Sequence, residues 1–257
     1  MKRKGRIMLD ILISSATHRS GSTLLQRLFN ARDKTLVWGE NGGCLTYFCS
    51  AYDQTKHYAR FKRQRRLFFN QDEDPNNWIA CMTPPVNVVD TAMIETVKAF
   101  HEKLYVENYN KQHDFIGYKE VRYGKPELLL FRKCYPKGIV MLLVRNPLDI
   151  WKSLSPTGMK KEYGSLEDFT NIWNERVEHY LELSLSDPNM HLIRYEDLIQ
   201  KQTNTIVLLK QIGQLENKDI ERVLDKKISS TSKPVSRKIE QQVIKKCGRL
   251  MEKLGYS

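Results

Sequence analysis

The sequence predicts an α/β fold: a parallel β-sheet flanked by helices on both faces, with a helical insert over the carboxyl ends of the strands. Apolar, strand-like runs alternate with helix-like segments along the 257 residues, a pattern typical of parallel sheets covered on both sides. No internal repeat, low-complexity tract or Gly/Ser linker interrupts the chain. Its length suits one large α/β domain, so we expect a single domain over residues 1–257.

Five strand-like runs make up the expected sheet. They are Ile7–Ile13, Thr35–Trp38, Phe115–Lys119, Ile139–Val144 and His191–Tyr195. Asp10 interrupts the first run and no small-residue cleavage site follows it cleanly, so we interpret this run as a core strand rather than a signal peptide. Polar residues stand at the carboxyl end of every run. In parallel α/β folds ligands bind at that edge of the sheet, which makes it the expected site.

Residues 41–114 are expected to form the helical insert and to determine substrate specificity. The segment is aromatic and basic; Pro84-Pro85 divides it, and Asp90 is expected to cap a helix over Thr91–Tyr109. The stretch Lys56–Arg66 contains six Lys or Arg and no acidic residue. A solvated helix face explains this charge most simply. Near the end of the chain, an apolar stripe over Ile239–Leu254 predicts a helix packed on the core.

The net charge of +12 favours anionic partners such as nucleotides, nucleic acid, acidic glycans or an anionic membrane. No apolar run is long enough to cross a bilayer. The five cysteines are scattered, without the spacing of a zinc site, so we expect free thiols in a cytoplasmic protein. No carboxylate or His/Cys cluster indicates a metal ion.

The first strand leads into a loop that is typical of phosphate binding. In the stretch Met8–Leu28, an apolar run is followed by small and hydroxyl residues and then by a helical pattern. The helix N-terminus offers free N–H groups and a partial positive charge. Gly21 allows close approach of the backbone and Arg19 adds a forked cation. The pattern GxxxxGK[ST] is absent, so the loop is not expected to bind ATP or GTP in the usual way.

A second anion-binding pattern follows the fourth strand. Arg145 ends that strand, Pro147 suits the first position of a helix, and Ser153 lies about two turns into it. Arg145 and Ser153 can therefore face one phosphate. An arginine at the sheet edge and a surface serine explain the same pattern equally well.

Together, HRSGSTLL (residues 18–25) and LLVRNPLDIWKS (residues 142–153) resemble the two donor-binding segments of sulfotransferases that use 3′-phosphoadenosine 5′-phosphosulfate (PAPS). The loop fits the branch with Arg-Ser-Gly-[ST]-[ST], which includes bacterial enzymes and protein-tyrosine sulfotransferases. RYEDL (194–198) and CGRLMEKLGY (247–256) also fit. His18 departs from the pattern, because proline is common there. The resemblance implies a P-loop-like sheet, transfer of a sulfuryl group to a hydroxyl or amine, and 3′-phosphoadenosine 5′-phosphate (PAP) as product, without a metal.

The resemblance assigns residues to the donor. It implies that the loop and the start of the helix bind the 5′ side of PAPS, namely Arg19, Ser20, Gly21, Ser22, Thr23 and Leu24. It implies that Arg145 and Ser153 bind the 3′-phosphate. Tyr195 either encloses the nucleotide or anchors the core. Lys233 and Arg237 lie in the late basic segment that closes over the donor, although the GxxGxxK pattern of cytosolic enzymes is missing there.

The resemblance also points to catalytic residues. Glu40 matches the general base, and partial burial beside Trp38 is expected to raise its pKa; an ion-paired or helix-capping role is the alternative. Lys119 would stabilise the transferred group, with Arg19 on its other side; the alternative for Lys119 is an ion pair with Glu120. Three histidines compete as bases, but none stands at an expected strand end: His57, His101 and His113. Trp38 either stacks on adenine or packs in the protein, and we favour packing.

Two other functions stay open. A nucleotide-dependent kinase with an atypical P-loop is disfavoured by the missing GK[ST] and by Arg145 at the end of the fourth strand. A non-catalytic binder of polyanions or nucleic acid is suggested by the net charge. For a sulfotransferase, the acceptor is a small molecule, a lipid or a glycan. No nucleic-acid partner is then expected, whereas the basic insert predicts peripheral contact with an anionic membrane. The oligomeric state is not predicted.

Overall fold

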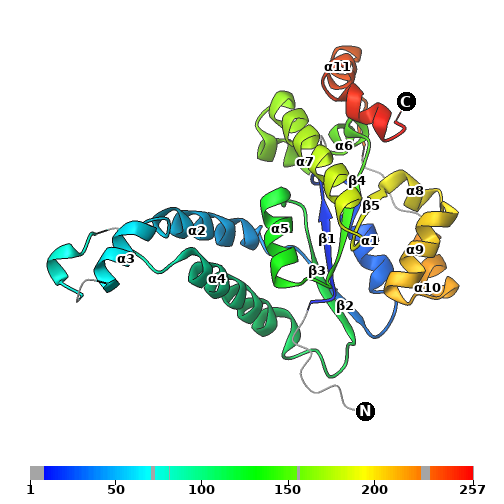
Figure 1. Ribbon diagram of the computed structural model, residues 1–257. Coiled ribbons are helices and arrows are strands. Elements are labelled where there is room, and N and C mark those ends of the chain that lie inside the picture. The colour runs from blue at the N-terminus through cyan, green and yellow to red at the C-terminus, as the bar shows by residue number, and fades with distance from the viewer. Residues whose placement is uncertain (1–8, 71–72, 81, 155–156, 227–231, 257) are drawn as a thin grey trace.

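The computed structural model describes residues 9–70, 73–80, 82–154, 157–226 and 232–256. At its centre is a five-stranded sheet in the order β2-β3-β1-β4-β5, in which every neighbouring pair is parallel (Figure 1). The strands are β1 (Ile11–Ser15), β2 (Thr35–Trp38), β3 (Phe115–Glu120), β4 (Ile139–Val144) and β5 (Met190–Arg194). The expected α/β class is confirmed.

Two of the five strands have the bounds that their apolar runs predicted, and the others shift by a few residues. β1 and β4 lie inside the sheet, with a neighbour on each side, and are buried on both faces, which explains the apolar residues 11–13 of β1 and the wholly apolar β4. β1 extends to Ser15, which pairs with Leu143 of β4, and the Ser14 hydroxyl is satisfied inside the core by the Tyr180 hydroxyl at 2.7 Å. Ile7 and Met8, expected in the first strand, lie outside the described residues.

Helices cover both faces of the sheet (Figure 1). One face carries α1 (Ser22–Phe29), α8 (Tyr195–Ile199), α9 (Thr203–Gly213) and α10 (Asn217–Leu224). The other carries α5 (Lys125–Cys134), α6 (Pro147–Leu154), α7 (Leu166–Ser186) and α11 (Arg237–Lys253). Because side chains alternate along a strand, Ile11 and Ile13 pack in the first layer and Leu12 in the second. Ile244 of α11, expected in the packed stripe, is half exposed.

The insert forms an arm that extends away from the sheet (Figure 1). It contains α2 (Cys44–Tyr58), α3 (Lys62–Asn70), the short 3-10 helix Pro75–Asn77, and α4 (Val86–His101), which continues as a π-helix over Glu102–Val106. A further 3-10 helix, Met159–Tyr163, precedes α7. None of the described helices is long and apolar enough to cross a membrane.

The expected start of the arm's second long helix was wrong. Pro85 occupies the N-cap of α4, and the helix begins one residue later. A proline can stand there because its missing N–H would have no intrahelical acceptor at a helix start. Asp90 lies inside the helix, where it accepts a hydrogen bond from the Tyr52 hydroxyl and lies 3.7 Å from Lys56 Nζ.

Candidate active site

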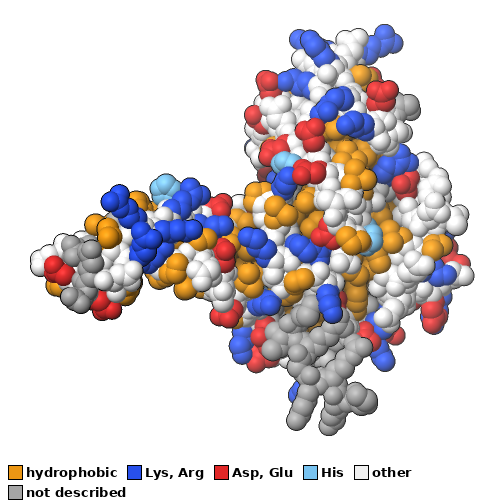
Figure 2. All heavy atoms as spheres, viewed as in Figure 1, with side chains coloured by type: hydrophobic (Ala, Val, Ile, Leu, Met, Phe, Trp, Pro, Cys, Tyr) orange, Lys and Arg blue, Asp and Glu red, His pale blue; other side chains and the backbone are white. Residues whose placement is uncertain are grey.

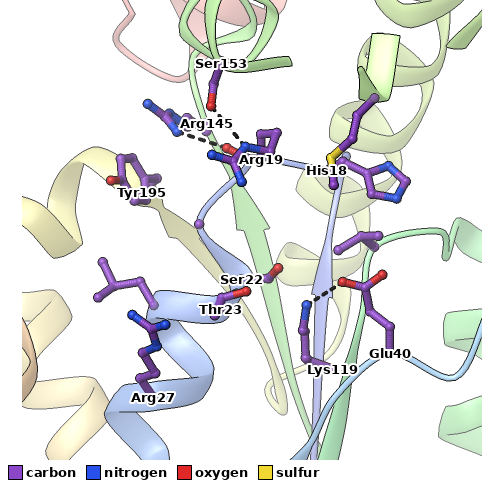
Figure 3. A pocket seen from close by; sticks show the side chains of 14 residues that line it. His18, Arg19, Ser22, Thr23, Arg27, Glu40, Lys119, Arg145, Ser153 and Tyr195 are labelled. Atoms are coloured by element: carbon purple, nitrogen blue, oxygen red, sulfur yellow. Dashed lines mark hydrogen bonds and ion pairs between the residues drawn. The ribbon is translucent and has the colours of Figure 1, made fainter. Parts of the chain in front are cut away.

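A cavity of about 350 Å³ lies at the carboxyl edge of the sheet, beside the start of α1. Figure 3 shows side chains from the loop after β1, from α1 and from the ends of β3 and β4 facing this space. The lining residues are His18, Arg19, Gly21, Ser22, Thr23, Leu24, Arg27, Glu40, Lys119, Val121, Arg145, Ser153, Met159 and Tyr195. The structure therefore brings most of the expected site residues together.

The loop after β1 has a backbone that only glycine suits at its turn. Gly21 has φ of +94°, and a Cβ added there would lie 2.2 Å from Cδ2 of Tyr195. Arg19 also has a positive φ, +64°. α1 begins directly after this turn at Ser22, so its first N–H groups, which lack intrahelical acceptors, lie at the cavity. This arrangement is a ready site for an anion.

Ser20 occupies a different place from its neighbours. Its side chain is fully buried, lies 3.2 Å from the Thr17 hydroxyl, and donates a hydrogen bond to the Thr17 carbonyl at 2.9 Å. Ser22 and Thr23 line the cavity, whereas Ser20 is not among the lining residues. The Ser20 hydroxyl therefore shapes the loop from behind.

The two anion-binding segments touch each other. Arg19 Nε donates to Ser153 Oγ at 3.0 Å, and Arg145 donates to the Arg19 carbonyl at 2.9 Å (Figure 3). The Arg145 guanidinium also stacks on the Tyr195 ring, 4.3 Å from its centroid. Ser153 is buried, so it is not the surface serine of the alternative interpretation. Arg145 Nε is buried and has no hydrogen-bond partner within the described chain.

Glu40 lies between two cations on the opposite wall of the cavity. Lys119 Nζ is 2.5 Å from one carboxylate oxygen and an Arg122 nitrogen is 3.0 Å from the other (Figure 3 draws the first contact). Burial raises the pKa of Glu40, but the hydrogen bonds and charges of Lys119 and Arg122 outweigh it, so the net pKa is lowered. The expected rise was therefore wrong, and Glu40 is ionised at neutral pH.

Lys119 does not pair with Glu120, because neighbouring residues in a strand point to opposite faces. Glu120 is fully buried and accepts hydrogen bonds from the backbone N–H groups of Asn41, at 3.2 Å, and Gly43, at 2.8 Å. Arg122 joins Glu120, at 2.7 Å, to Glu40. The buried carboxylate thus fixes the loop that follows Glu40.

Four lining residues were not predicted as site residues: His18, Arg27, Val121 and Met159. Arg27 follows Thr23 by four residues, a helical spacing that places both on one face and could have revealed it. His18 Nδ1 lies 3.0 Å from the Tyr163 hydroxyl and Nε2 lies 3.3 Å from Glu162. Burial lowers the pKa of His18, while Glu162 opposes that change.

Several expected residues lie elsewhere. Neither Lys233 nor Arg237 lines the cavity; the N–H of Lys233 donates to the Lys152 carbonyl at 3.2 Å. Trp38 packs edge-on against Tyr109, with ring centroids 4.8 Å apart. None of the three competing histidines lines the cavity, and burial lowers the pKa of one of them, His101, to about 3. No group of metal-ligating side chains occurs among the described residues.

Comparisons with known proteins identify the family and the fold. A model of the sulfotransferase family matches residues 15–213. The sulfotransferase domain of the Synechococcus PCC 7002 olefin synthase is similar in fold, with a TM-score of 0.57 and 15% identity over 96% of this chain and 94% of that one. The sulfotransferase domain from the curacin biosynthetic pathway has a TM-score of 0.56 and 17% identity, over 97% and 99% of the two chains.

A third structure, the sulfotransferase STF9 from Mycobacterium avium, has a TM-score of 0.54 and 10% identity over 95% of this chain and 76% of that one. No curated protein matches the chain significantly. At such identities the structures establish the fold, whereas the family model covers more than half of the chain. The chain belongs to the sulfotransferase family.

Proposed function

We propose that the protein transfers a sulfuryl group from PAPS to a hydroxyl or amine acceptor, with Glu40 as the general base. The observation that carries this proposal is the junction of Arg19, Arg145 and Ser153 at one cavity. A donor with phosphate groups at both ends of a nucleoside needs two anion-binding segments side by side. One phosphate loop alone would serve many nucleotides.

The residues at the cavity fit such a donor. Arg145 Nε is buried and has no hydrogen-bond partner among the described residues, and the glycine turn at Gly21 leaves the backbone open to an anion. The loop from Arg19 to Thr23 and the start of α1, including Leu24, would bind the 5′ side. Arg145 and Ser153 would bind the 3′-phosphate. PAPS itself supplies the sulfuryl group, held on a phosphosulfate linkage.

The acceptor would lose its proton to Glu40. A carboxylate accepts a proton only when ionised, and the ion pairs of Glu40 keep it so at neutral pH. Lys119, held 2.5 Å from that carboxylate, stands where it can stabilise negative charge on the transferred group. Positioning of donor and acceptor would supply much of the remaining rate enhancement.

The deciding experiment is a transfer assay with labelled PAPS over small-molecule, lipid and glycan acceptors, combined with calorimetry of PAP binding. Glu40→Gln should lose turnover and keep PAP binding, whereas Glu178→Gln on the exposed side of α7 should keep both. Full activity of Glu40→Gln would refute its role as base. Tighter binding of ATP–Mg than of PAP would favour a kinase and overturn the donor assignment.

A cytoplasmic location forms part of the proposal. The described cysteines are free thiols: Cys44, Cys49, Cys134 and Cys247. Free thiols support a reducing compartment. Oxidative cross-linking during expression would argue against it.

A further inference from the structure

The arm carries a surface that the donor site does not use. None of the described residues in 41–114 lines the cavity, although this segment was expected to shape the substrate site. Figure 2 shows Lys and Arg side chains gathered over the arm, away from the sheet. We call this surface the arm tip; it comprises the exposed residues Arg60, Lys62, Arg63, Arg66, Leu67, Phe69 and Trp78.

The four cations of the arm tip form no described ion pair, although Glu73 and Asp74 lie between Phe69 and Trp78 in the sequence. No acidic residue occurs between Gln54 and Asn70. Within the described part of the chain, no ion pair joins Arg60, Lys62, Arg63 or Arg66 to a carboxylate. Two nearby cations are held: Lys56 lies 3.7 Å from Asp90, and Arg65 donates to the Thr83 carbonyl at 2.6 Å. Four positive charges therefore face solvent together.

Large apolar side chains stand exposed among these charges. Phe69 is 56% exposed, Trp78 is 49% exposed and Leu67 is 39% exposed. Phe68 is buried beneath them, with its ring centroid 4.7 Å from that of Trp78 and 5.1 Å from that of Phe69, both edge-on. This packing holds two aromatic rings at the surface, where exposure is costly unless a partner covers them.

The arm tip combines cations and ordered aromatic rings from α3 and from the segments on either side of it, and an anionic lipid bilayer recognises this combination. Aromatic rings favour the headgroup region, and Lys or Arg residues gain from anionic lipids at that surface. A soluble polyanion would use the cations but would gain little from Leu67, an aliphatic side chain. The observations therefore favour a bilayer over a nucleic acid or glycan.

The arm is connected to the catalytic wall at its base. α2 begins at Cys44, directly after Gly43, whose N–H is held by the buried Glu120 carboxylate at 2.8 Å. Glu120 is bridged to Glu40 through Arg122. The arm thus leaves the body next to the edge of the cavity and carries its tip outward (Figure 1).

We propose that the arm tip docks the protein reversibly on an anionic lipid bilayer. Phe69 and Trp78 enter the headgroup region, and Arg60, Lys62, Arg63 and Arg66 pair with anionic lipids. This inference does not depend on the identity of the sulfate donor, because no residue of the arm tip lines the cavity. The protein is therefore expected to bind anionic vesicles both with and without PAP in the donor site.

The test is sedimentation of the full chain with vesicles of phosphatidylcholine alone or mixed with phosphatidylserine. The wild type should bind the mixed vesicles and lose binding as salt rises. The variant R60Q/K62Q/R63Q/R66Q should bind more than about 100-fold more weakly, from the loss of four cations near the surface. A matched control, K137Q/K238Q/K245Q/K253Q, removes four exposed cations elsewhere and should keep binding.

A second pair of measurements separates the bilayer from a soluble polyanion. Phe69→Ser with Trp78→Ser should weaken vesicle binding and leave heparin binding unchanged. Brominated lipid should quench wild-type tryptophan fluorescence more than that of Trp78→Phe. Equal melting temperatures and equal PAP affinities would establish that the variants fold.

Three results would overturn the proposal. One is equal loss of vesicle binding in the control quadruple variant, which would assign binding to net charge alone. Another is full vesicle binding without Phe69 and Trp78. The third is stronger binding of heparin or RNA than of vesicles, lost only with the four cations, which would identify a polyanion site instead.

Discussion

Replacing Gly21 by alanine tests how the donor loop is held. The new Cβ would lie 2.2 Å from Cδ2 and 2.6 Å from Cε2 of Tyr195, in a backbone with φ of +94°. The left-handed backbone costs about 1–2 kcal/mol in a residue with a Cβ. The Tyr195 ring must also move off Arg145, now 4.3 Å from its centroid, which costs about 0.5–2 kcal/mol. Gly21→Ala should therefore destabilise the fold by about 1.5–4 kcal/mol.

The assay is chemical and thermal denaturation, with PAP binding measured by calorimetry. For a chain of this size the melting temperature should fall by roughly 5–10 °C. Gly158→Ala is the matched control, since Gly158 has φ of +73° but nothing lies within 4 Å of its added Cβ. Gly158→Ala has the unfavourable left-handed backbone without the clash, so its free energy of unfolding should fall by only about 1–2 kcal/mol.

A double variant isolates the clash. In Gly21→Ala combined with Tyr195→Ala the ring is gone, so the pair should be less damaging than the two single costs together. Strict additivity, or a Gly21→Ala no worse than Gly158→Ala, would show that Tyr195 does not enforce glycine at this turn.

Three further predictions concern the charged groups of the cavity. Arg145→Ala should weaken PAP binding about 10- to 100-fold by calorimetry, the loss of hydrogen bonds to a charged group, and leave the binding of adenosine 5′-phosphate much less affected; equal losses would contradict a contact with the 3′-phosphate. Ser153→Ala should weaken PAP binding by less than Arg145→Ala, because it also frees Arg19 from its 3.0 Å hydrogen bond; a larger loss would contradict this balance. Because the folded pKa of Glu40 is lowered, its ion pairs stabilise the fold above the unfolded pKa of about 4.3 and stop doing so as pH falls through the folded value. Urea midpoints of Glu40→Gln should thus lie below those of the wild type at pH 7 and approach them as the pH falls below about 4.3; a constant difference would refute this linkage.

The sheet could be predicted well because its signal is local. The run Ile139–Val144 has no polar residue and is only six residues long, as is typical of a strand buried on both faces. The next three residues, Arg145, Asn146 and Pro147, indicate where the strand ends and where α6 begins. The sequence also predicted that Arg145 and Ser153 lie at one site, and both line the same cavity.

The electrostatics of Glu40 could not be predicted in this way. The sequence places Glu40 two residues after Trp38, which suggests burial and a raised pKa. Its charge is instead set by Lys119 and Arg122, about eighty positions away, which approach only when β3 pairs beside β2. The predicted N-cap of α4 was wrong for a similar reason, because Asp90 contacts Tyr52 and Lys56 of α2, more than thirty positions earlier in the chain, rather than a helix end.

The contact between Arg19 and Ser153 refines the donor assignment. The resemblance gives Arg19 to the 5′ side and Ser153 to the 3′-phosphate, yet Arg19 Nε reaches Ser153 Oγ at 3.0 Å. A guanidinium has five N–H groups, so Nε can keep its hydrogen bond to Ser153 while the terminal nitrogens donate to another group. The backbone carbonyl of Arg19 accepts from Arg145 at 2.9 Å, so the three residues form one connected cluster at the cavity. For the proposed donor, Arg19 would therefore lie between the 5′ and the 3′ segments rather than belong to the 5′ side alone, which would link recognition of the complete donor to the geometry of transfer.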